Sequence, residues 1–318
     1  MSHQRWAVVF RALLMVSSMI SGMLLLIDRV NAGYLYVVLE VGDIVAYDVS
    51  LSTAAEIEAS KRTVMQGYGA GPYGMVLDRR GNLFVANFFL DNISKFGPSG
   101  QFITSFTGNL SGPLGLAMDD SGDLYVSSFH TSTVTRFSSE GVVKSRITSN
   151  IINPVGLTFD AAGNLYVANS NGGAITKFDS NGVFVGSLVA FTPEGIYISP
   201  SGTIFATLRD RDRVRKMDAS GNFVKVFGLD DLKTPSSIVA DDSGNLYVTN
   251  RGKTKIHKYD QEGNLLLSWD TPYYTYGALF DNRSYPVPEP TSFFAFATLT
   301  TFAVGCYRKR SRILSQRK

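Results

Sequence analysis

Glu194 is the residue of this chain best suited to chemistry, because it is an acid at a position where related segments have none. It lies between Pro193 and Gly195, and the matching positions of four similar segments hold Tyr73, Leu114, Val155 and Ser236. A carboxylate among such neighbours would be desolvated, which raises its pKa unless a cation or hydrogen-bond donors pair with it. With amide oxygens nearby it could bind Ca²⁺ weakly. The competing hypothesis is that water or backbone amides hold it.

Three asparagines recur at a second position, after Leu-Phe-Val-Ala, Leu-Tyr-Val-Ala and Leu-Tyr-Val-Thr; they are Asn87, Asn169 and Asn250. Their amides could surround one mouth of a central channel and bind a ligand. The alternative is that each asparagine ends a strand and hydrogen-bonds its own loop. We favour the local interpretation because the position repeats, and we keep the three residues with Glu194 as the candidate ligand-binding set.

No catalytic residue is predicted. The sequence contains no Gly-x-Ser-x-Gly, no Walker loop and no His-Glu-x-x-His. We expect His130 and His257 to face solvent. The only cysteine, Cys306, lies in an apolar C-terminal run, which excludes a disulfide framework before it. Five bases recur on strands, and we expect them to lie near turn carboxylates and not to form an anion-binding ring; they are Lys95, Arg136, Lys177, Lys216 and Lys258.

The composition indicates a folded body with a mildly acidic surface. Of the 318 residues, 44% are hydrophobic and 18% are charged, which allows a sizeable core. The net charge of +3 comprises +6 in 291–318 and +2 in 1–32, so residues 33–290 carry −5. A nucleic-acid partner needs a basic patch and is therefore disfavoured.

The elements that position these residues form a repeat. Five aligned segments begin with proline at spacings of 41, 41, 39 and 42; they start at Pro72, Pro113, Pro154, Pro193 and Pro235. Each has an apolar strand, a turn with Asp three residues before Gly or a close variant, a Leu-Tyr-Val-like strand and two further strands. Four short strands in about forty residues predict one propeller blade, and neighbouring blades must stack around an axis.

The two ends of this region complete each other. Residues 34–48 match the second and third strands of a unit and 63–65 its fourth, while the last unit, starting at Pro272, offers only a first strand at 277–281. We therefore predict an all-β fold, a six-bladed propeller over 33–281 that is closed by strands from both ends.

The repeat resembles the NHL repeat in its Pro-x-Gly opening, Asp-x-x-Gly-Asn turn and Leu-Tyr-Val-Ala-Asn strand. It departs from that pattern at Ser199 and Thr203, and at Ser237, which replaces the Gly. The resemblance implies a propeller that binds partners, although some related propellers are lactonases or lyases. Glu194-Gly195 is similar to the Glu-Gly that opens the metal site of lactonase-type propellers.

The flanking segments predict export. Residues 1–32 have a basic start, an apolar run and a small-residue end, which is typical of a cleaved signal peptide. At the other end a linker (282–290) precedes an uncharged run (291–307) and a basic tail (308–318), which predicts a transmembrane helix with its tail in the cytoplasm. This order resembles the PEP-CTERM sorting signal, whose matching residues are Pro288, Glu289, Pro290, Arg308, Lys309 and Arg310.

That resemblance implies an exosortase-type membrane protease as a partner, which would cut near the motif; the alternative is a plain anchor. Our leading hypothesis is an exported, non-enzymatic propeller at the cell surface or in the matrix. It would bind a polysaccharide, a protein or a small ligand. The alternative is a metal-dependent hydrolase or lyase with Glu194 as a ligand.

Overall fold

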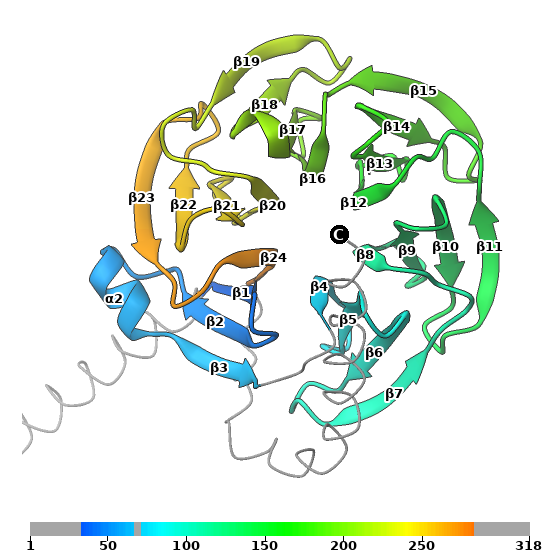
Figure 1. The fold of residues 1–318 in the computed structure, drawn as a ribbon, viewed down its shortest axis with the longest axis horizontal. Coiled ribbons are helices and arrows are strands. Elements are labelled where there is room, and N and C mark those ends of the chain that lie inside the picture. Colours follow the sequence, from blue (N-terminus) through cyan, green and yellow to red (C-terminus); the bar gives the residue numbers. More distant parts are fainter. Residues whose placement is uncertain (1–32, 67–70, 283–318) are drawn as a thin grey trace, which may run out of the picture.

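The computed structural model describes residues 33–66 and 71–282, which form a ring of six four-stranded sheets (Figure 1). The strands of each blade run antiparallel from the axis outward. The six-bladed prediction is confirmed. The predicted signal peptide, linker motif, transmembrane segment and basic tail lie outside these residues. Within them, no helix is both long and apolar enough to cross a membrane.

Blades 2 to 6 are each continuous in sequence. From the axis outward, blade 2 consists of β4 (Pro72–Leu77), β5 (Leu83–Asn87), β6 (Asn92–Phe96) and β7 (Phe102–Phe106). Blade 3 consists of β8 (Pro113–Met118), β9 (Leu124–Ser128), β10 (Thr133–Phe137) and β11 (Val143–Ile147). Blade 4 consists of β12 (Pro154–Phe159), β13 (Leu165–Asn169), β14 (Ala174–Phe178) and β15 (Phe184–Val189). Blade 5 consists of β16 (Pro193–Ile198), β17 (Ile204–Leu208), β18 (Arg213–Met217) and β19 (Phe223–Phe227). Blade 6 consists of β20 (Pro235–Ala240), β21 (Leu246–Asn250), β22 (Lys255–Tyr259) and β23 (Leu265–Asp270).

Blade 1 takes its strands from both ends of the body, as predicted. Its order is β24 (Thr275–Asp281), β1 (Tyr34–Leu39), β2 (Ile44–Asp48) and β3 (Arg62–Met65). The inner pair is antiparallel, with Tyr34 opposite Asp281 and Leu39 opposite Thr275. Thr275 therefore holds the place that proline has in the other blades, and the unit does not begin at Pro272 as we expected.

The repeated residues have physical reasons. Proline begins the five inner strands of blades 2 to 6, which are sheet edges where a missing N–H costs no ladder hydrogen bond. The glycine two residues later lies where inner strands crowd together: a Cβ on Gly115 would collide with the carbonyl oxygen of Val155. In the turns, the Asp78 carboxylate accepts from the N–H groups of Arg80 and Asn82, and Gly81 has a φ of 84°.

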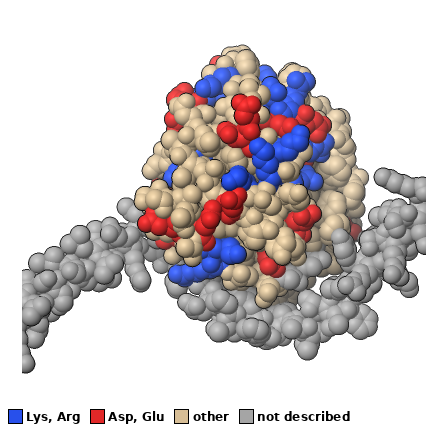
Figure 2. Space-filling view, turned by 60° about the vertical axis from the view of Figure 1, so that its left-hand side comes forward, with Lys and Arg blue, Asp and Glu red and all other residues tan. Residues whose placement is uncertain are grey.

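The bases of the third strands are structural, as we predicted. Each lies over the aromatic ring of the neighbouring second strand, 5.0–5.8 Å from its centroid; the pairs are Lys95 on Phe84, Arg136 on Tyr125, Lys177 on Tyr166, Lys216 on Phe205 and Lys258 on Tyr247. Arg136 also pairs with the turn carboxylate of Asp119 at 2.9 Å, and Lys177 with Asp160 at 3.4 Å. Acidic and basic side chains are interspersed over the face drawn in Figure 2.

The hydrophobic core lies between blades, where the facing sheets of neighbours interdigitate. The cluster between blades 2 and 3, for example, joins Phe84 and Ile93 to Leu124 and Phe137, all fully buried. A short helix that the sequence did not reveal, α2 (Ala54–Ala59), closes the seam between blades 6 and 1. Figure 1 shows this helix beside β2 and the end of β23. Its buried Ile57 belongs to the same apolar cluster as Trp269 of β23.

The ring has two distinct ends. The turns between first and second strands, such as 78–81, lie at one end, which we call the turn face. The loops that follow the second strands and those that lead into the first strands lie at the other end. We call this the cavity face, because residues of both loop sets line a cavity there.

Candidate functional site

A cavity of about 320 Å³ lies at the cavity-face end of the propeller axis. One side of its wall is charged and is formed by blades 5 and 6, which contribute Glu194, Arg209 and Arg251. The other side is apolar and aromatic, and its main residues are Tyr73, Phe88, Leu114, Phe129, Val155 and Tyr276. A concave site with an apolar wall and a few converging polar groups is typical of small-ligand binding.

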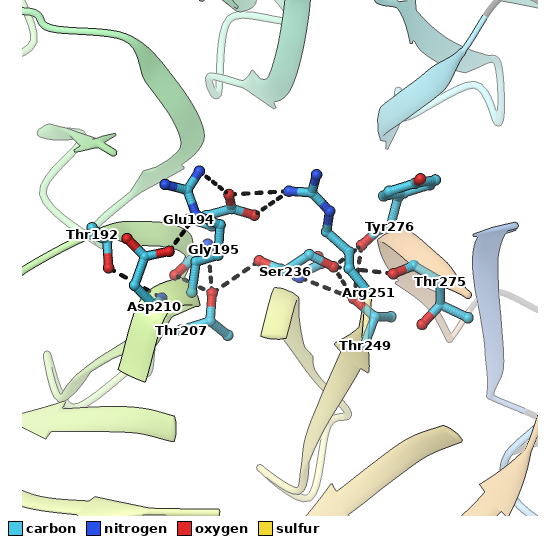
Figure 3. Close-up of polar contacts among 12 residues, drawn as sticks. Thr192, Glu194, Gly195, Thr207, Asp210, Ser236, Thr249, Arg251, Thr275 and Tyr276 are labelled. Carbon is cyan, nitrogen blue, oxygen red and sulfur yellow. Dashed lines mark hydrogen bonds and ion pairs between the residues drawn. The ribbon is translucent and has the colours of Figure 1, made fainter. Parts of the chain in front are cut away.

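Glu194 is the centre of the charged side. Its side chain is 3% exposed, and its Oε1 lies 3.1 Å from Nη1 of Arg209 and 3.1 Å from Nη1 of Arg251. Arg251 Nη1 also donates to Oε2 at 3.2 Å (Figure 3). Burial raises the pKa of Glu194, and the two guanidinium groups oppose this by stabilising the carboxylate. Two arginines therefore hold the acid.

Two repeated positions of the blade build the wall. The first is the residue after the opening proline, which gives Tyr73, Leu114, Val155 and Glu194, and Tyr276 after Thr275. The second is the residue that directly follows the second strand, which gives Phe88, Phe129, Arg209 and Arg251. Sequence reasoning identified the first position and missed the second. The signal was available, because two arginines replace aromatic residues there in successive blades.

Arg251 joins the charged side to the aromatic side. Its guanidinium carbon lies 5.7 Å from the ring centroid of Tyr73 and 5.3 Å from that of Tyr276. The two rings are 5.2 Å apart. Burial, and next the Glu194 carboxylate, raise the pKa of Tyr73, so its phenol stays protonated at neutral pH. The cation is thus held by a carboxylate and two aromatic rings.

Hydroxyl groups beneath the site fix the inner strands to one another. Thr207 Oγ1 accepts from the N–H of Gly195 at 2.7 Å and donates to the carbonyl of Ser236 in the next blade at 2.9 Å. Thr249 Oγ1 and Ser236 Oγ each lie 2.7 Å from the carbonyl oxygen of Tyr276 (Figure 3). These contacts cross blade boundaries, so they hold Glu194 and Tyr276 in a rigid frame.

The three asparagines hydrogen-bond to neighbouring loops and strands, and two of them accept from the loop that leads into the first strand, 17 residues earlier. Asn169 Oδ1 accepts from the N–H of Ile152, and Asn250 Oδ1 accepts from that of Lys233, both at 2.9 Å. Asn87 Nδ2 donates to Asn92 Oδ1 at 2.6 Å and to Ser94 Oγ at 2.9 Å. All three are buried, and none is among the residues that line the axial cavity. The structure therefore does not bring them together with Glu194.

Our expectation for the histidines is wrong in one case. His130 is exposed, but His257 on β22 is only 3% exposed and its Nδ1 lies 3.4 Å from Asn250 Nδ2. Burial lowers the pKa of His257 to about 4. The counterparts of His257 on β6, β10 and β14 are Ser94, Thr135 and Thr176, all buried, so this position faces inward in those blades too.

Metal ligands are not gathered at the site. Across 33–66 and 71–282, no group of three or more His, Cys, Asp or Glu side chains is arranged to hold a metal ion. The single acid at the axis is already paired with two cations. Weak Ca²⁺ binding through Glu194 stays a prediction, although the charge around the carboxylate repels a cation.

A second depression lies on the cavity face between blades 4 and 5, with a volume of about 780 Å³. Arg211 lies over the ring of Phe191 in its wall, 4.0 Å from the centroid. Its remaining lining is formed by polar loop residues such as Asn171 and Asp212. It contains no counterpart of the buried Glu194 group, so we assign the candidate site to the axial cavity.

Comparisons with known proteins agree with this architecture. No protein-family model and no curated protein matches the sequence. Among solved structures, virginiamycin B lyase from Staphylococcus aureus is 17% identical with a TM-score of 0.55, covering 64% of this chain and 71% of that chain. A chain of a nidogen/laminin complex is 16% identical with a TM-score of 0.68, covering 80% of this chain and all of that chain. A protein of unknown function from Bacteroides caccae is 14% identical with a TM-score of 0.64, covering 79% and 100%.

The likeness shows the fold. Six-bladed propellers host catalysts and binding modules alike, so the function must be argued from the site.

Proposed function

We propose that this chain is an exported propeller that acts as a binding module outside the cell, with the axial cavity as its ligand site. The observation that carries the binding role is the preformed cavity, in which a rigid ion group faces an aromatic wall. Such a site fixes a small ligand's orientation with few polar contacts and gains affinity from apolar burial. The export signals of the sequence support the location at the cell surface or in the matrix.

The alternative is a metal-dependent hydrolase or lyase. The likeness to virginiamycin B lyase supports it only in so far as that lyase has a similar fold. The site geometry favours binding over this alternative. A catalytic cation would have to displace two guanidinium groups from Glu194, and no second acid lines the buried part of the cavity with it. Glu40 also lines the cavity, but it is exposed at the rim.

A small-molecule screen with a blocked variant tests the binding role. Val155→Trp adds bulk to the cavity wall from the start of β12, and we expect some compounds to raise the melting temperature of the wild type but not of this variant. Val183→Trp is the control, because Val183 is 60% exposed on the outer rim and that variant should respond like the wild type. Compounds that stabilise all three proteins equally would place binding elsewhere and contradict the proposal.

The sorting part of the proposal concerns the C-terminal region. In a host with the matching exosortase-type protease, we expect the mature protein to end near Pro288, Glu289 and Pro290. Replacing Arg308, Lys309 and Arg310 with glutamine should reduce processing, because basic residues hold that end of a span in the cytoplasm. Mass spectrometry of the intact mature protein measures both. A chain from the native host that still ends at Lys318 would leave a plain anchor as the explanation.

A further inference from the structure

The net charge of the ion group in the wall of the axial cavity is positive. Glu194 contributes one negative charge, and Arg209 and Arg251 contribute two positive charges within 3.2 Å of it. Two further acids are near but face water: Asp210, which pairs with Nε of Arg209, is 55% exposed, and Glu40 lies at the rim. Water screens exposed charges more strongly than buried ones, so the two acids offset the arginines less than Glu194 does, and the inner part of the cavity keeps a net positive charge.

Arg251 is the cation best placed to meet a ligand. Glu194 engages only its Nη1 atom, although a guanidinium group carries five N–H donors on three nitrogens. Nε and Nη2 form the other edge of the same plane, an edge that matches the two oxygens of a carboxylate. In Figure 3 one nitrogen of the Arg251 guanidinium group is joined to the two oxygens of Glu194, and the other two nitrogens lie farther from this carboxylate.

The wall beside Arg251 is suited to a flat apolar group. Tyr73 and Tyr276 lie against the guanidinium, and Phe88, Phe129, Leu114 and Val155 continue the wall around the axis. Aromatic rings stack or meet edge to face with another ring at such a wall. At about 320 Å³ the cavity lies at the small end of the range for ligand pockets, so it suits a compact ligand.

We propose that the axial cavity binds a small organic monocarboxylate with a flat apolar body. Its carboxylate pairs with Nε and Nη2 of Arg251, and its body packs against the ring of Tyr73 and the neighbouring apolar wall. A monoanion neutralises the charge of the Glu194 group, whereas a dianion leaves an unpaired charge and a cation is repelled. This inference rests on the proposed function, since it assumes that the cavity is the ligand site.

Three probes with the same ring and a small polar group of different charge test the ligand class. Benzoate, benzyl alcohol and benzylammonium share one ring, and their binding to the full-length chain is measured by titration calorimetry or ligand-observed NMR. Benzoate should bind about tenfold more tightly than benzyl alcohol because of the charge-assisted pair, and benzylammonium should bind most weakly. Binding of benzyl alcohol as tight as that of benzoate would overturn the anion class and leave the cavity as the site.

Two substitutions separate this site from a cation site. Glu194→Gln keeps the size of the side chain and removes its charge, so benzoate should bind more tightly to it than to the wild type. A cation site would lose its ligand instead. Arg251→Met should weaken benzoate by about tenfold or more while benzyl alcohol keeps its affinity, which shows that the cavity is still formed.

The remaining outcomes are also decisive. Arg80→Gln on the exposed turn face is the control and should bind benzoate like the wild type. Weaker benzoate binding to Glu194→Gln would overturn the proposal. If none of the three probes binds the wild type, both the monocarboxylate class and the axial cavity as a site for such ligands are wrong.

Discussion

Deletion of residues 272–281 is expected to abolish the cooperative unfolding of the propeller. These residues include all of β24, the inner strand of blade 1, which pairs with β1 from Tyr34 to Leu39. Without it, blade 1 has three strands and its inner edge is unpaired. Buried residues such as Thr275 and Ala278 are lost from the axis, and the apolar edge of β1 is exposed.

The expected loss is large compared with the stability of the whole domain. Removing a strand that closes a ring affects both neighbouring blades, since β24 also contacts β4 and β20. We expect a loss of roughly 5 kcal/mol or more, which approaches the net stability of an ordinary domain. Urea unfolding followed by circular dichroism measures it. The control is a chain that ends after Asn282 and keeps β24. If the deletion variant and this control unfolded at the same urea concentration, β24 would not close the ring.

Acid should destabilise the wild type through His257. Burial lowers the pKa of this histidine from its ordinary value of 6.5 to about 4. The Asp231 carboxylate opposes this shift, and the nearby Lys253 and Lys255 act in the same direction as burial. The folded state therefore binds fewer protons than the unfolded state between these values. Stability is complete above pH 6.5 and is lost as the pH falls toward 4, by about 2 kcal/mol at pH 5.

The matched variant is His257→Thr, because Thr135 and Thr176 occupy the same position in blades 3 and 4. Its free energy of unfolding should fall less than that of the wild type between pH 7.5 and pH 5, by about 2 kcal/mol. His130→Thr is the control, since His130 is exposed and its replacement should keep the wild-type pH dependence. If the free energy of unfolding of wild type and of His257→Thr fell equally between pH 7.5 and pH 5, the buried imidazole would not be the cause of the acid destabilisation.

The repeat made most of the fold predictable from the sequence. Each blade repeats the same short sequence features. Five aligned prolines, four of them followed two residues later by glycine, were therefore enough to predict the number of blades and the closing pair of strands. The helix α2 has no counterpart in other blades, and its six residues are held by a capping box of Thr53 and Glu56 and by burial of Ile57. Packing across the seam stabilises it, which no single-segment pattern reveals.

The site was predictable only in part for a related reason. Glu194 was visible because it breaks the pattern at one repeated position. Its partners Arg209 and Arg251 occupy a different repeated position, 15 and 57 residues further along the chain, and only the ring brings the three together. His257 was misjudged because strand position alone suggested solvent, whereas its counterparts in other blades are small and buried.

The pairing of Tyr34 with Asp281 also determines which face of the propeller lies toward a support when the protein is attached through its flanking segments. The chain enters the propeller at Tyr34 and leaves it at Asp281, and both residues lie at the turn face. Leu39 and Tyr276, near the opposite ends of the same two strands, line the cavity. Strands of six or seven residues separate the attachment point from the cavity mouth by about 20 Å. A propeller immobilised through either flank would therefore present its open mouth to the bulk solution, and a ligand could enter and leave without detachment of the protein from its support.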